Sequence, residues 1–277
     1  MGYIREIYKA GATLVIREKM KRRVEKNQKR APKTNHTTEK VWLYNLKQAA
    51  FKLTLILNEN FVPGDHHLQL TYKIEPASRE EAKKDRSKFL RKVTNECKKR
   101  NIDFKWVAIT EKTGGRFHHH IVCSNIPVDI IKKCWSKEEK GTAFHNPLWD
   151  FPNYADLAEY LIKEAAQLHT EEGSISKKRY TTSKNIIVPE GRQVEITRKS
   201  IEDEPTVFKN FDLDTDSVQV YENELTDTIC REYILIARPE AKYRSKGTKI
   251  TGEYVNYSKA LRKAYREEQL SFWEEIQ

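Results

Sequence analysis

Cysteine is scarce in this chain, and the few cysteines present have no pattern that binds metal or forms disulfides. Cys97, Cys123, Cys134 and Cys230 are the four among 277 residues, and no two of them form a C-x-x-C pair. This spacing excludes the common structural zinc sites and gives no sign of a disulfide framework. With no signal peptide in the sequence, we expect a cytoplasmic protein.

Long apolar runs are missing as well. No stretch approaches the roughly 20 apolar residues that a membrane-spanning helix needs. Glu6 occupies the position at which a myristoylation signal has Ser or Thr. The sequence therefore predicts no membrane partner.

Positive charge is in excess but unevenly distributed. The net charge is +11; residues 1–40 hold 12 Lys and Arg against 4 Asp and Glu, whereas residues 191–277 hold 14 against 17. An excess in the first two-thirds of the chain indicates a polyanionic partner, most simply nucleic acid. The densest basic run, Lys19–Lys33, is expected to form a helix that ends before Pro32. It either contacts phosphates or is a solvated tail.

The most informative stretch is Trp106–Cys123, which predicts two strands joined by a tight turn. Residues that favour strands dominate both halves, and two adjacent glycines lie between them. A turn over residues 112–115 pairs Glu111 with Arg116.

Because side chains alternate along a strand, this pairing places Glu111, His118 and His120 on one face of the hairpin. His119 points to the opposite face, which is apolar. Two imidazoles and a carboxylate that converge can hold a divalent metal. The alternative is a buried hairpin whose histidines are satisfied by hydrogen bonds.

Other elements follow from periodicity and capping residues. Alternating apolar residues predict strands, helical spacing predicts helices, and Ser78 opens a capping box. We expect helices over 41–60, 78–100, 129–135 and 253–273, and strands over 68–74 and 232–238. Residues 141–150 are expected to be irregular, with His145 as an ordinary loop histidine.

Residues 152–169 predict a helix with a polar stripe beside its apolar one. Asp156, Tyr160, Lys163 and Glu164 lie on the polar stripe at spacings of three and four residues. A tyrosine with a lysine one turn away can act as a nucleophile, because the lysine balances charge on the phenolate or on a phosphate. The alternative is an exposed tyrosine beside a helical salt bridge.

A second basic cluster follows this helix. It suits contacts with phosphates and stacking on a base, and the alternative is a solvated loop; its members are Lys177, Lys178, Arg179, Tyr180 and Lys184.

Residues 200–227 then turn acidic, with nine Asp and Glu against one lysine. We expect a basic, helical N-terminal region over 1–66, a catalytic domain over 67–190 and an acidic C-terminal region over 191–277.

Three motifs occur in an order that resembles a known family. They are Leu70-Thr71-Tyr72, the histidine motif Gly115–His120, and the Y-x-x-K motif Tyr160–Lys163. Over roughly residues 40–190 the chain resembles the rolling-circle replication initiators of bacterial plasmids and phages, members of the HUH endonuclease superfamily. Glu111 lies where that family has a third metal ligand. One departure is His119, at a position that is usually hydrophobic in the family.

The resemblance implies an α+β fold with a central antiparallel sheet and flanking helices, ferredoxin-like or RRM-like, with N-terminal helical and C-terminal extensions. It also implies a nickase that cuts and joins single-stranded origin DNA. Mg²⁺ or Mn²⁺ would be held by Glu111, His118 and His120, and would polarise the scissile phosphate. Tyr160 would form a 5′-phosphotyrosine bond, and Lys163 would stabilise charge nearby.

The resemblance extends to partners. Arg116 and the cluster Lys177–Lys184 would contact DNA. A host polymerase would extend the freed 3′-hydroxyl. Further expected partners, in a bacterial cytoplasm, are a helicase and a second copy of the chain. No second tyrosine lies a turn from Tyr160, so termination would use another subunit or a water. Asp156 or Glu164 would activate that water.

Three alternatives remain open. A relaxase normally has its tyrosine ahead of the histidine motif, and a single-tyrosine transposase shares the order seen here but is typically smaller. The third is a non-catalytic nucleic-acid-binding module on an RRM-like sheet, in which Tyr72, Trp106 and Tyr180 stack on bases.

Overall fold

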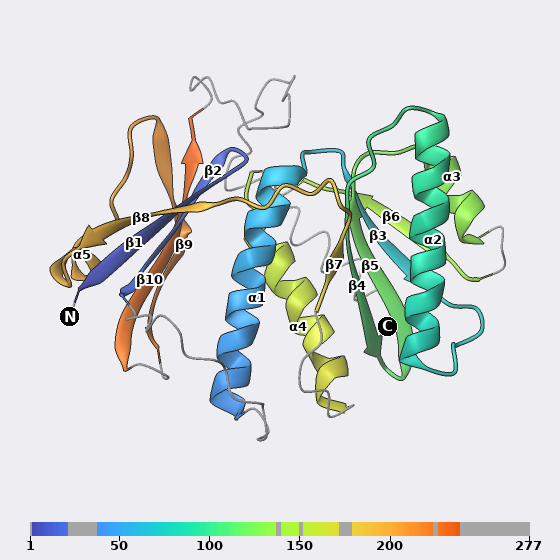
Figure 1. The fold of residues 1–277 in the computed structure, drawn as a ribbon, viewed down its shortest axis with the longest axis horizontal. Coiled ribbons are helices and arrows are strands. Elements are labelled where there is room, and N and C mark those ends of the chain that lie inside the picture. Colours follow the sequence, from blue (N-terminus) through green and yellow to red (C-terminus); the bar gives the residue numbers. More distant parts are fainter. Residues whose placement is uncertain are drawn as a thin grey trace, which may run out of the picture.

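The protein has an α+β fold with two five-stranded antiparallel sheets and five helices in the residues described (Figure 1). The structure is a computed structural model, and it describes residues 2–21, 38–136, 140–149, 152–171, 179–223 and 227–238. The expected fold class is confirmed. None of the helices in these ranges is long and apolar enough to cross a lipid bilayer.

The first sheet carries the histidine hairpin and has the strand order β6-β3-β5-β4-β7. Its strands are β3 (His66–Thr71), β4 (Trp106–Thr113), β5 (Arg116–Cys123), β6 (Ala143–Pro147) and β7 (Thr181–Thr182). Helices α2 (Arg79–Lys99) and α3 (Val128–Cys134) pack on one face, and α1 (Glu39–Asn60) and α4 (Ala155–Glu171) lie on the other. Each face therefore has its own apolar core.

Local sequence explains most of these elements. In β3, Leu68 and Leu70 are fully buried while the residues between them are half-buried, which is the expected alternation. Helix α2 begins where its capping residue predicts, because the Ser78 side chain accepts a hydrogen bond from the backbone of Glu81. The prediction for residues 141–150 was wrong, since β6 pairs there with β3.

The second sheet joins the two ends of the described chain. Its order is β8-β1-β2-β10-β9, with strands β1 (Tyr3–Ala10), β2 (Thr13–Met20), β8 (Gly191–Ile196), β9 (Phe211–Asn223) and β10 (Thr228–Ala237), and the short helix α5 (Lys199–Glu202). The helical N-terminal region was therefore wrong for residues 3–20, which form a hairpin. Most of the helix expected over Lys19–Lys33, and all of that expected over 253–273, lie outside the described residues.

Helix α1 lies between the two sheets (Figure 1). Its Phe51 and Leu55 pack against strands of the second sheet, and Leu53 and Leu57 pack against the first sheet and α4. The two sheets thus pack against opposite sides of one helix. This shared helix holds the first sheet, with its histidine hairpin, in a set orientation relative to the second sheet.

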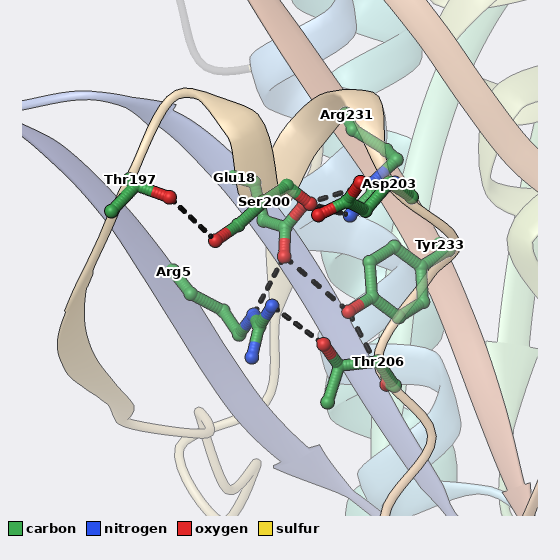
Figure 2. A network of polar contacts seen from close by, with 8 residues as sticks. All are labelled: Arg5, Glu18, Thr197, Ser200, Asp203, Thr206, Arg231 and Tyr233. Atoms are coloured by element: carbon green, nitrogen blue, oxygen red, sulfur yellow. Dashed lines mark hydrogen bonds and ion pairs between the residues drawn. The ribbon is translucent and has the colours of Figure 1, made fainter.

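A buried carboxylate holds the second sheet together (Figure 2). Glu18 of β2 is fully buried and accepts hydrogen bonds from Arg5 at 2.6 Å and from Arg231 of β10 at 2.8 Å. Arg231 also donates to the backbone carbonyls of Ser200 and Asp203. The network connects strands from both ends of the described chain to the segment around α5.

Gly11, in the turn between β1 and β2, offers a sharp test of this packing. Its φ is +54°, and a Cβ there would lie 1.9 Å from the backbone oxygen of Asn58. We expect Gly11→Ala to destabilise the protein by about 2–4 kcal/mol in urea unfolding, because it adds a steric clash to the cost of a left-handed backbone. Gly114 is the matched control, since its φ is +58° and no atom lies within 4 Å of the added carbon. Equal losses for the two variants would contradict the close approach of Gly11 to α1.

Candidate active site

The hairpin of β4 and β5 brings Glu111 and the outer two histidines to one face of the first sheet. The turn consists of Gly114 and Gly115, both with positive φ, so Glu111 pairs directly with His118. The sequence-based register, which paired Glu111 with Arg116, was wrong by two residues. A shift of two keeps every side chain on its face. Glu111, His118 and His120 therefore share a face, as the alternation predicts.

The centre of this face is a chain of hydrogen bonds through His120. His120 Nε2 lies 2.7 Å from Glu111 Oε1, and its Nδ1 lies 3.0 Å from Nε2 of His67 on β3. Glu111 and His120 are almost completely buried. Burial lowers the pKa of His67 to about 3, and the neighbouring His120 contributes to this shift. His67 is therefore neutral near pH 7 and has a lone pair available.

His118 completes the polar face. Burial is the main cause that lowers the pKa of its imidazole, against the opposing effect of Glu111. Its Nδ1 is buried without a hydrogen-bond partner in the described residues, and the same holds for Oε2 of Glu111. Buried polar atoms without a partner are uncommon in folded proteins, and a bound cation would satisfy both of these atoms.

His119 belongs to the opposite core. It is fully buried, with Nε2 2.7 Å from the hydroxyl of Tyr72 and Nδ1 3.0 Å from Oγ1 of Thr110. Thr110 in turn accepts a hydrogen bond from Arg86 of α2. Both ring nitrogens of His119 are engaged in this network, on the side of the sheet away from Glu111.

Helix α4 places Tyr160 over the polar face. The ring of Tyr160 makes an edge-on contact with His120, with centroids 5.8 Å apart, and the residue is 41% exposed. Burial, then the charges of Glu111 and Glu164, raise the pKa of the phenol. The hydroxyl is therefore protonated near pH 7 unless a positive charge offsets these carboxylates.

The other polar residues of α4 differ in their relation to the polar face. The pKa of Glu164 is raised, mainly by burial and then by the charge of Glu111, while His120 and Lys163 act in the opposite direction. The carboxyl of Glu164 therefore interacts electrostatically with Glu111 and His120. Lys163 is exposed one turn after Tyr160, and Asp156 is exposed in the first turn of the helix.

The predicted DNA-contacting residues are dispersed. Arg116 is at the end of the hairpin, where its guanidinium contacts Glu75 at 2.9 Å. Arg179 donates to the backbone of Asn45 on α1, Tyr180 packs against the core around α4, and Lys184 is exposed. Lys177 and Lys178 lie outside the described residues.

A divalent ion fits the donor set of the face. As the side chains stand, they bond to one another, and no group of three or more His, Cys, Asp or Glu in the described residues is arranged around a common point. Oε2 of Glu111 and Nδ1 of His118 nevertheless have no hydrogen-bond partner among the described residues, so both atoms are available as ligands. Imidazole and carboxylate together suit first-row divalent metals.

His67 is the residue that sequence reasoning missed. Alternation along β3 places it with Gln69 and Thr71, away from the leucines of the core. Its proximity to His120 depends on β3 and β5 being neighbours, which no local pattern reveals.

Comparison with known proteins finds one family model that matches part of the chain. Residues 65–168 match the family model described as replication-associated protein ORF2/G2P. The matched segment runs from β3 through most of α4 and contains His67, Glu111, His118, His120 and Tyr160. Searches of curated proteins and of solved structures return no match. The family match supports a role in the initiation of DNA replication.

Proposed function

We propose that the protein initiates rolling-circle replication by nicking and rejoining one DNA strand at the origin. The contact of the Tyr160 ring with His120, in the face that also holds Glu111 and His118, carries this proposal. It joins a nucleophile to a set of metal donors within the segment that matches a replication-associated family.

Tyr160 attacks the scissile phosphate of single-stranded DNA in line. A bond forms between its phenolic oxygen and phosphorus, and the bond from phosphorus to the 3′-oxygen breaks. The tyrosine then holds the 5′-phosphate, and a free 3′-hydroxyl is available to a host polymerase. The phosphodiester energy is conserved in the covalent bond, so a later 3′-hydroxyl can reverse the step.

The surrounding residues adjust charge and position. Glu111, His118 and His120 would hold Mg²⁺ or Mn²⁺, with His67 in contact with His120. When bound, the ion neutralises charge on the scissile phosphate. Lys163 supplies a fixed positive charge one turn from Tyr160. Glu164, which interacts electrostatically with Glu111 and His120, accepts a proton from the nucleophile or from a water.

The test is a search for a covalent adduct. The protein is incubated with Mn²⁺ and a set of single-stranded oligonucleotides that tile the origin of its replicon, then denatured and separated by electrophoresis. A protein band shifted by the mass of the 3′ fragment supports the proposal. Oligonucleotide binding without any adduct across the whole set favours a non-catalytic nucleic-acid-binding module.

Metal binding provides a separate prediction. We expect His118→Ala and Glu111→Ala each to weaken Mn²⁺ binding at least about tenfold, since each removes one metal ligand. Electron paramagnetic resonance of free Mn²⁺ measures this without any DNA. His145→Ala is the control, because His145 is exposed on β6 and faces the opposite side of the sheet. Unchanged Mn²⁺ affinity in both ligand variants would rule out this face as the metal site.

A further inference from the structure

In the described residues, the helices cover only part of the sheet face that holds the candidate active site, and the uncovered part is called the open half. The apolar core on this face draws on β4 and β5 through Val107, Ile109 and Val122, which pack against α1 and α4. On β3, the side chains of Gln69 and Thr71 share the face with the histidines but are only half-buried. Among the described residues, no helix packs on the surface over β3 and β6, which lies beside Tyr160.

An exposed aromatic side chain stands on this open half. Phe144 of β6 pairs with Gln69, which itself pairs with His120 on the other side of β3. Residues paired across antiparallel strands point to the same face, so Phe144 shares the face of His120. Its neighbours agree, because Ala143 packs into the core beneath α2 and Leu148 packs into the core beneath α4.

Phe144 has no structural role that explains its exposure. The residue is 53% exposed, on an edge strand, and no stacking partner for its ring is found in the described residues. Exposed large apolar residues on a sheet edge invite unwanted pairing, so proteins tend to avoid them. The surroundings are polar, with Gln69 on the neighbouring strand and exposed Asn146 on the same strand face.

We infer that Phe144 is a base-stacking residue, which holds a nucleotide of single-stranded DNA next to the scissile phosphate. This inference rests on the proposed function, because it assumes that the substrate is single-stranded DNA bound with its backbone along the face that holds His118 and His120. Aromatic rings on open sheets stack on unpaired bases with little regard to sequence. The open half offers such a ring together with the amide groups of Gln69 and Asn146 for base edges.

The aromatic residues first considered for stacking are placed elsewhere. Tyr72 is buried and hydrogen-bonded to His119, and Trp106 packs against the core beneath α2. Tyr180 packs against the core beneath α4. None of these three shares the open surface with Phe144.

Binding of single-stranded DNA tests the inference independently of catalysis. The full chain carrying Tyr160→Phe, which lacks the nucleophilic hydroxyl, is titrated in EDTA into a fluorescein-labelled oligothymidylate of about 20 nucleotides. Adding Phe144→Ala is expected to raise the Kd about 5- to 150-fold, the range measured for loss of one stacked base. Phe144→Trp should restore binding, since it keeps a flat ring.

Two measurements separate stacking from a general disturbance of the edge strand. His145→Ala alters the adjacent position, which faces the other side, and should leave the Kd unchanged. Ultraviolet crosslinking of an oligothymidylate that carries 5-bromodeoxyuridine should attach to Phe144, as located by mass spectrometry. Equal affinity of the Phe144→Ala protein and its parent overturns the inference, as does an equal loss with His145→Ala. Absence of a covalent adduct in the catalytic assay overturns the nickase but not the stacking.

Discussion

Replacing Tyr160 with phenylalanine is expected to abolish formation of the covalent protein–DNA adduct. The loss should be at least about 10⁴-fold in rate, because no other group can supply the attacking oxygen from the same position. The substitution removes one atom, and the hydroxyl makes no hydrogen bond within the described part of the chain. The ring contact with His120 is kept, so single-stranded DNA and Mn²⁺ should bind as they do to the unaltered protein.

The control for this result is a second tyrosine at the start of α4. Tyr154 is fully buried in the core between α1 and α4, and its backbone N–H donates to Asn58. Tyr154→Phe should retain adduct formation, although it can lower stability. Electrophoresis after incubation with labelled origin oligonucleotides measures both variants side by side. An adduct that survives Tyr160→Phe would show that another residue is the nucleophile.

Replacing Glu18 with glutamine is expected to destabilise the folded protein by about 3–5 kcal/mol. The substitution removes the negative charge that Arg5 and Arg231 share, and replaces one of the two acceptor oxygens with an NH2 donor that faces a guanidinium. A buried charge whose partner is removed carries its full desolvation penalty. Urea unfolding followed by circular dichroism measures the change.

Two further variants identify the cause of that loss. Glu195 pairs with Lys21 on the same sheet, but both side chains are largely exposed, so Glu195→Gln should have no measurable effect. Combining Glu18→Leu with Arg231→Met should recover part of the stability, because Arg231 no longer presents a buried unpaired charge, while Arg5 keeps, among the described residues, only its hydrogen bond to Thr206. If the double variant is less stable than either single one, packing rather than charge accounts for the effect.

Much of the candidate site could be predicted because it depends on local rules. Alternation alone assigned Glu111, His118 and His120 to one face and His119 to the other, and the two-residue shift in register left that assignment intact. The register itself was wrong because two glycines can close a turn alone, and strand propensity does not define where a strand ends. His67 and Phe144 depend on the order of strands in the sheet, which is set by packing between distant segments.

Most of the second sheet could not be predicted for the same reason; of its strands, only β10 overlaps a predicted one, over residues 232–238. The helical N-terminal region was predicted from the basic run Lys19–Lys33, yet the residues just before it form strands, and Glu18 and Arg17 are buried by pairing with β10. Their partner strand lies more than 200 residues away in the sequence. A charged residue within a predicted strand indicates a buried position only when the residue of opposite charge that pairs with it is known.

This pairing also has a consequence for synthesis of the chain on the ribosome. The β1–β2 hairpin is synthesised before β10, which begins at residue 228; at 5–20 residues per second the delay is roughly 10–40 s. During that time the edge of β2 is unpaired and open to other nascent chains. Charged side chains that point inward from an edge strand oppose such pairing. We therefore expect Glu18 and Arg17 to oppose aggregation of the nascent hairpin; in the folded protein both form ion pairs with β10.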